Sequence, residues 1–144
     1  MSTVLYLVVP CYNEEETLPT TEKALTNLLS DMIKRGRISE NSRIVFVNDG
    51  SKDKTWELIE KYTEENILIK GIKLSRNKGH QNALLAGLMT VKDECDCAVS
   101  LDADLQDDIG AVEKMLADGY PPGILKSANF PGGNDYNKKI IEPH

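Results

Sequence analysis

The sequence has few cysteines and no excess of basic charge, and each shortage argues against a class of protein. Three cysteines among 144 residues are an odd and sparse set, which argues against a disulfide framework and for a reducing compartment. Cys95 and Cys97 lack the second Cys/His pair that a structural zinc site needs. With 17 Lys and Arg against 23 Asp and Glu, the net charge of −6 argues against a general nucleic-acid binder.

Long apolar runs are absent as well. The longest, Val4–Pro10, is far too short to span a bilayer, so we expect no transmembrane segment. No basic segment followed by an apolar stretch opens the chain, and a cytoplasmic location is therefore expected. No Gly-x-Gly-x-x-Gly follows any apolar run, which disfavours a dinucleotide-binding dehydrogenase.

The full chain is 40% apolar and 28% charged, as expected for a soluble globular protein. Its residues 1–117 alternate short apolar runs with helical patterns. Leu18, Leu25, Leu29 and Met32 mark one helix face that ends near Gly36, and Asp53 is a candidate N-cap of the next helix. Further helices are expected around 84–91 and from 109 to 117. The apolar runs predict buried strands at 4–9, 43–47, 67–74 and 97–101.

This alternation of predicted strands and helices indicates an α/β fold with a mainly parallel sheet and helices on both faces. Residues 118–144 differ, because they hold four of the six prolines and four of the ten glycines and show no periodicity. We expect them to form an irregular tail. The predicted sheet therefore ends after its fourth strand.

Polar residues follow each predicted strand, and ligands of open parallel sheets bind beyond the carboxyl ends of the strands. The fourth strand delivers Asp102 and Asp104, which point the same way in extended geometry. Two carboxylates about 4 Å apart repel by roughly 4 kcal/mol at an effective dielectric near 20. A divalent cation would remove this repulsion and bridge to a diphosphate.

Asp-x-Asp is a weak motif, so other interpretations stay open. It equally fits a solvated acidic turn before a helix that starts at Ile109. A calcium loop fits less well, since Asp107 stands where glycine is needed. An Asp-x-Asp phosphatase would place the motif after the first strand rather than the fourth.

The segments that follow the other predicted strands offer further candidate ligand-binding residues, and each has a purely structural alternative. Asp49 can accept a hydrogen bond from a base edge, or can simply belong to a turn. Tyr12 can stack a base or pack against the fold. Arg76 and the turn at Gly79 can meet phosphate. His80 is expected to start a helix.

Taken in order, four segments resemble family 2 glycosyltransferases, which have the GT-A fold. They are VVPCYNEEETL, IVFVNDGSKDKT, LSRNKGHQNALLAGL and SLDADLQDD. The resemblance covers about residues 3–117, the N-terminal portion of such enzymes. It fits best the subgroup of dolichol-phosphate mannosyltransferases and bactoprenol glucosyltransferases.

The resemblance implies roles for individual residues. It assigns Pro10, Tyr12 and Glu14 to base and ribose, Val47 and Asp49 to nucleobase contacts, and Arg76 and Gln81 to a loop that borders the nucleotide. Asp102, Ala103 and Asp104 match the metal and diphosphate motif, with Asp102, Asp104 and Gln106 as metal ligands for Mn²⁺ or Mg²⁺. No counterpart of the catalytic base is found.

The resemblance also implies the reaction: inverting transfer of a sugar from a UDP- or GDP-sugar to a polyprenyl or dolichyl phosphate, at the cytoplasmic face of a membrane. The chain is expected to carry mainly the donor-binding half. A catalytically incomplete fragment or a partner-binding module is the alternative. An apolar sheet edge left by the short sheet predicts a homo-oligomer.

Overall fold

Parallel strands form one sheet in the order β3-β2-β1-β4-β5. The structure is a computed structural model that describes residues 3–104, residue 112 and residues 125–127. Every strand pair within this part is parallel, which confirms the predicted α/β class. The strands are β1 (Leu5–Cys11), β2 (Arg43–Asn48), β3 (Ile69–Lys73), β4 (Cys97–Ser100) and β5 (Leu125–Ser127).

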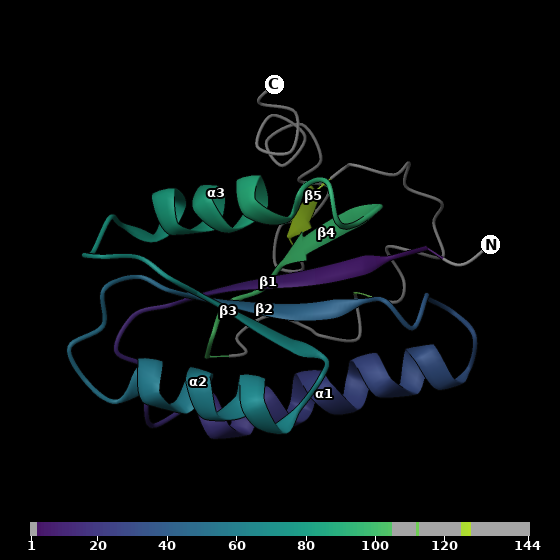
Figure 1. The fold of residues 1–144 in the computed structure, drawn as a ribbon, viewed down its shortest axis with the longest axis horizontal. Coiled ribbons are helices and arrows are strands. Elements are labelled where there is room, and N and C mark those ends of the chain that lie inside the picture. The colour runs from purple at the N-terminus through teal and green to yellow at the C-terminus, as the bar shows by residue number, and fades with distance from the viewer. Residues whose placement is uncertain (1–2, 105–111, 113–124, 128–144) are drawn as a thin grey trace.

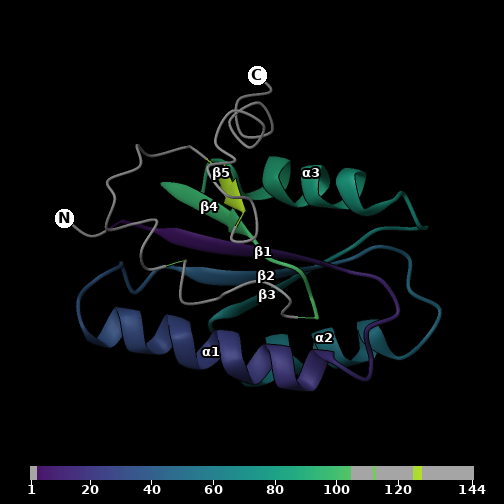
Figure 2. The same ribbon diagram turned by 180° about the vertical axis from the view of Figure 1, so that it is seen from behind.

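Helices cover both faces of the sheet, as the sequence predicts. Figures 1 and 2 show α1 (Leu18–Lys34) and α2 (Thr55–Glu65) on one face and α3 (His80–Val91) on the other. All residues of β1 are buried, because its alternating side chains enter two separate clusters. One cluster lies under α1 and α2, and the other lies under α3.

Helix α1 buries the face that its periodicity predicts. Leu18, Leu25, Leu29 and Met32 are all fully buried. The helix ends at Lys34, just before Gly36, which has φ of +74°. Glycine adopts this left-handed conformation without the Cβ clash that other residues meet, so the predicted end is confirmed.

The start of α2 differs from the prediction by one residue. Lys54 is the N-cap, and Asp53 precedes it. Asp53 still serves the helix, because its Oδ1 accepts a hydrogen bond from the Thr55 N–H at 2.9 Å. Burial opposes ionisation of Asp53, but hydrogen bonds from Thr55 and Glu15 outweigh it and lower its pKa.

Strand β5 corrects the expectation that the sheet ends after β4. Residues 125–127 pair in parallel with 98–100, and they lie within the segment for which the sequence predicts an irregular tail. Three residues are too few to show the alternation on which strand prediction depends. The helix predicted at 109–117 falls outside the described residues, apart from the buried Val112.

The connection through α3 reverses the direction in which the sheet is built. From β1 the chain proceeds outward to β2 and β3, and α3 then returns it to β4 on the other side of β1. The strand order therefore reverses between β1 and β4, and the carboxyl ends of these two strands lie on either side of this switch point. Ligands of open α/β sheets bind at such points. In the described part of the chain, no helix is both long and apolar enough to cross a membrane.

Candidate functional site

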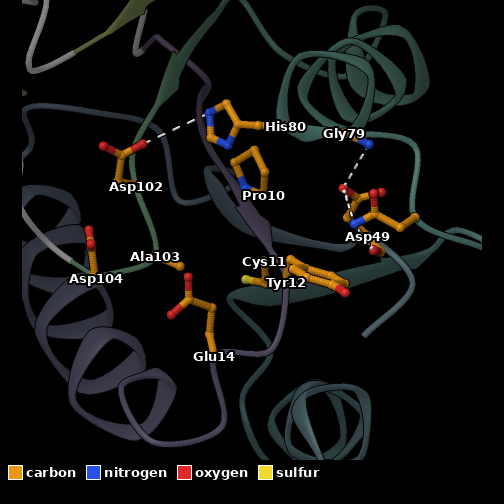
Figure 3. A pocket seen from close by; sticks show the side chains of 11 residues that line it. Pro10, Cys11, Tyr12, Glu14, Asp49, Gly79, His80, Asp102, Ala103 and Asp104 are labelled. Carbon is orange, nitrogen blue, oxygen red and sulfur yellow. Dashed lines mark hydrogen bonds and ion pairs between the residues drawn. The ribbon is translucent and has the colours of Figure 1, made fainter. Parts of the chain in front are cut away.

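A cavity of about 480 Å³ opens at this switch point. It is drawn in Figure 3, with side chains from the start of α3 and from the segments at the carboxyl ends of β1, β2 and β4. These segments are called the exits of the strands. Seven of the predicted site residues line it, together with four to which the resemblance assigns no role. The full lining consists of Pro10, Cys11, Tyr12, Glu14, Asp49, Asn77, Gly79, His80, Asp102, Ala103 and Asp104.

The exit of β1 carries Tyr12 and Glu14 and is tied to the exit of β2. Tyr12 is 42% exposed and lines the cavity, so part of its side chain is open to a ligand. The Glu14 N–H donates to Thr55 Oγ1 at 2.8 Å, and the Asn13 N–H donates to Ser51 Oγ at 2.9 Å. These cross-loop hydrogen bonds fix the backbone that presents both side chains to the cavity.

Asp49 is buried and bonded to the segment between β3 and α3. Only 2% of the residue is exposed. Its Oδ1 accepts from the Lys78 N–H at 2.7 Å, and its Oδ2 accepts from the Gly79 N–H at 3.1 Å and from Asn77 Nδ2 at 3.2 Å. Burial of a carboxylate is costly unless such donors compensate for the lost water.

The next residue, Gly50, lets the two exits approach each other. Its φ is +67°, and a Cβ at this position would lie 2.2 Å from the Asn77 nitrogen and 2.4 Å from the Arg76 carbonyl carbon. No side chain fits against backbone at these distances, so glycine is required here for two independent reasons.

Asp102, Ala103 and Asp104 form the acidic side of the cavity. Asp102 is half-buried, with its Oδ1 3.9 Å from His80 Nε2, while Asp104 is exposed. Ala103 is buried, and its carbonyl accepts a hydrogen bond from the Thr21 hydroxyl of α1. The backbone between the two carboxylates is therefore anchored to a helix 82 positions earlier in the chain.

The two carboxylates suit a divalent cation only with help from other ligands. Within the described residues, no group of three or more His, Cys, Asp or Glu side chains could hold a metal ion. Asp102 and Asp104 provide two hard oxygen donors, which is typical of Mg²⁺ sites completed by substrate phosphates and water. Gln106, the third predicted ligand, lies outside the described residues.

Three other predicted residues do not line the cavity. Val47 is fully buried in β2, and a Cβ on Gly87 of α3 would lie 2.7 Å from its Cγ2. Val47 thus packs α3 onto the sheet. Arg76 and Gln81 are exposed and flank the segment that reaches the cavity.

Four lining residues, Cys11, Asn77, Gly79 and His80, have no role in the family resemblance. Their positions at the end of β1 and around the start of α3 are the signal by which the sequence can indicate them, as it does for the turn at Gly79. His80 starts α3, as predicted, and the start of this helix faces the cavity. Burial, with a smaller contribution from the Glu14 charge, raises the pKa of the Cys11 thiol far above its usual range, so this cysteine is not a nucleophile at neutral pH.

Fold and site together define a parallel α/β domain with a carboxylate-lined ligand cavity at its switch point. Comparison with known proteins identifies the family. The profile described as "Glycosyl transferase family 2" matches residues 6–118, and the chain belongs to this family.

Curated relatives agree with this assignment. The chain is 50% identical over 113 residues to the "Uncharacterized glycosyltransferase YkoT" of Bacillus subtilis (strain 168), a match that covers 78% of this chain and 34% of the relative. It is 34% identical over 110 residues to the "Bactoprenol glucosyl transferase" of Shigella phage SfX, covering 76% and 33%. The chain thus spans about a third of the length of these relatives.

Solved structures share the fold. S. aureus TarS 1-349 in complex with UDP superposes with a TM-score of 0.56 at 23% identity, over 79% of this chain and 31% of that one. The mannosyltransferase PcManGT from Pyrobaculum calidifontis, in complex with GDP-Man and Mn²⁺, gives 0.59 at 20% identity, over 86% and 34%. At these identities the likeness shows the fold alone, and it confirms the GT-A type expected from the sequence.

Proposed function

We propose that this chain carries the donor-binding part of a glycosyltransferase that moves a sugar from a UDP- or GDP-sugar to a polyprenyl or dolichyl phosphate. One observation carries the proposal: Tyr12, Asp102 and Asp104 line a single cavity at the switch point of a family 2 glycosyltransferase chain. An aromatic face suits a nucleobase, and paired carboxylates suit a cation-bound diphosphate.

The nucleoside would lie along the exits of β1 and β2. Pro10, Tyr12 and Glu14 are proposed for base and ribose, and Asp49 for the base side of the cavity. Val47 would act from beneath, since it is buried. Arg76 and Gln81 would have to reach the nucleotide from outside the cavity lining.

The diphosphate would lie at the exit of β4. Asp102, Asp104 and Gln106 are proposed to hold Mn²⁺ or Mg²⁺, with Ala103 placed between the two aspartates. A bound divalent cation stabilises the charge that develops on a departing diphosphate. The chain's own contribution is to fix the two carboxylates, through the bond from Thr21 to the Ala103 carbonyl.

A lipid phosphate is the proposed acceptor. The relatives include the phage SfX bactoprenol glucosyl transferase and the "Undecaprenyl-phosphate 4-deoxy-4-formamido-L-arabinose transferase" of Aeromonas hydrophila. A phosphate oxygen is already ionised at neutral pH, so it can displace the diphosphate directly at the anomeric carbon without a general base. Such an acceptor would lie at a membrane surface, and the cytoplasmic face is the one proposed.

A second candidate is a catalytically incomplete fragment or partner-binding module that keeps the fold. It is favoured by the share of the relatives, about a third, that the chain spans.

Self-association through an exposed sheet edge also remains a prediction, and light scattering that gives a monodisperse monomer would contradict it.

Calorimetric titration of the chain with UDP, GDP and their sugars, with and without Mn²⁺, tests the donor-binding proposal. We expect binding that strengthens with Mn²⁺ and loses this dependence in Asp104→Asn. Asp31→Asn makes the same charge change on the outer face of α1, where Asp31 pairs with Arg35 at 2.8 Å, and is the matched control.

If the chain binds none of these nucleotides, the proposal is refuted. Sugar transfer to a polyprenyl phosphate by this chain alone, abolished by Asp104→Asn, would exclude the incomplete-fragment alternative. Binding without transfer would favour that alternative.

A further inference from the structure

Asp49 is hydrogen-bonded to the protein more extensively than is expected of a side chain that only binds a ligand. Four hydrogen bonds join Asp49 to the segment Asn77–Gly79, three at its carboxylate and one at its backbone carbonyl, which accepts from Asn77 Nδ2 at 3.1 Å. A carboxylate has about four acceptor sites. Most of this one is therefore committed to the protein itself.

The bonded segment leads directly into the cavity. Gly79 has φ of +94° and is the N-cap of α3, and the Ala83 N–H donates to its carbonyl at 2.9 Å to begin the helix. Gly79 and the next residue, His80, both line the cavity. Holding Gly79 thus determines where the helix starts and where the His80 ring lies.

A second contact makes the placement specific. Gly50 fits against the backbone of Arg76 and Asn77 at a distance that excludes any Cβ. The exit of β2 and the segment after β3 are therefore joined by steric fit as well as by hydrogen bonds. Figure 3 shows the connection from Asp49 to Gly79 on one side of the cavity and from His80 to Asp102 on the other.

We propose that Asp49 is a positioning residue: its carboxylate holds Asn77–Gly79, and through this segment it places the start of α3 and His80 against the diphosphate of a bound nucleotide. Helix N-termini favour anions, because their first N–H groups lack intrahelical partners. Asp49 then controls affinity for the diphosphate part of the ligand as well, in addition to the contact with the base for which it is proposed above. This inference rests on the proposed function for the identity of the ligand.

Asp49→Asn is the decisive variant because it keeps the size of the side chain. It replaces one acceptor oxygen by an NH₂ group, which would face an N–H donor of Lys78 or Gly79. We expect amide hydrogen exchange at Lys78 and Gly79 to accelerate on the order of tenfold or more, since hydrogen bonds to charged groups are among the strong ones. The Kd of inorganic pyrophosphate, which has no base, should rise together with the Kd values of UDP and GDP, each measured with Mn²⁺.

Asp53→Asn is the matched control. Asp53 is also a carboxylate that accepts backbone N–H groups, from Glu15 and Thr55, but it does not line the cavity. This variant should leave exchange at Lys78 and Gly79 and the Kd of pyrophosphate unchanged.

A spectroscopic readout separates positioning from general loss of structure. The chain has two histidines, so the ring signal of His80 can be assigned by its loss in His80→Gln. Addition of pyrophosphate should shift this signal in wild type, and the shift should be reduced in folded Asp49→Asn. If Asp49→Asn does not fold, Asn77→Leu removes the side-chain part of the connection and should accelerate exchange at the same two amides to a smaller extent.

A second pattern of results would overturn the inference that Asp49 positions this segment. If Asp49→Asn weakens binding of the nucleotides but not of pyrophosphate, while the Lys78 and Gly79 amides exchange at the wild-type rate, Asp49 acts on the base alone and the inference is wrong. Failure of wild type to bind any nucleotide would refute the proposed function instead, and the exchange rates would still decide whether Asp49 holds the segment.

Discussion

Gly50 and Gly36 provide a direct test of how closely the exits of β2 and β3 are packed. Both have positive φ, +67° and +74°, so alanine at either position must adopt the left-handed conformation, at a cost of about 1–2 kcal/mol. They differ in their surroundings. A Cβ at Gly36 would meet nothing within 4 Å, whereas at Gly50 it would lie 2.2 Å from the Asn77 backbone nitrogen.

The difference between the two variants isolates the steric contact. Overpacking against a fixed neighbour costs about 1–3 kcal/mol, so we expect Gly36→Ala to lose about 1–2 kcal/mol and Gly50→Ala about 2–5 kcal/mol. Urea unfolding followed by circular dichroism measures both. With an m-value of roughly 2 kcal/mol/M, the midpoints should separate by about 0.5–1.5 M.

Equal stability of the two variants would refute the reasoning. It would mean that the Asn77 backbone moves aside at no cost, and that the hydrogen bonds of Asp49 to this segment do not define a fixed geometry. A larger loss in Gly36→Ala would contradict the packing described for both glycines.

Three further predictions concern other contacts. Burial raises the pKa of Cys97 to about 11, so alkylation at pH 8 should be at least about tenfold slower in the native than in the urea-unfolded chain; equal rates would contradict this. Glu94→Gln removes the negative charge that pairs with Lys70 at 2.6 Å, whose hydrogen bond lowers the pKa of Glu94. Its cost, at most about 1 kcal/mol for so exposed a pair, should be present at pH 7 and disappear as the pH falls below about 4.3, which thermal melts at both pH values can check. Thr21→Val removes the hydroxyl that donates to the buried Ala103 carbonyl and should cost about 1–3 kcal/mol, whereas Thr21→Ser should retain most of the stability; identical urea midpoints for the two would exclude a role for the hydroxyl.

Much of the fold could be predicted because periodicity reports burial. The apolar runs of β1, β2 and β4 are buried on both faces, and the spacing of Leu18, Leu25, Leu29 and Met32 follows one helix face. The parallel order then places the strand exits at one edge, which is why the sequence alone assigns Tyr12, Asp49 and Asp102 to a common site.

The remaining features depend on contacts between distant segments, which local patterns do not encode. The connection between Asp49 and Gly79 requires the close approach that Gly50 permits, and the bond from Thr21 to Ala103 joins positions 82 residues apart. Strand β5 has three residues, and its pairing depends on an available edge of β4. The family resemblance assigns Val47 to the nucleobase, which stays a proposal, whereas its packing against Gly87 depends on the approach of α3 and is not encoded locally.

The placement of β4 beside β1 has a consequence for synthesis of the protein. Asp96, just before β4, accepts a hydrogen bond from the Val4 N–H, and the two residues lie 92 positions apart. At roughly 5–20 residues per second, the ribosome needs about 5–18 s to make the chain between them. β2 and β3 are made within this interval and can pair before β4 exists, whereas one edge of β1 lacks its partner until the interval ends. An unpaired strand edge can pair with other chains, and the cavity for the ligand cannot exist before the interval ends.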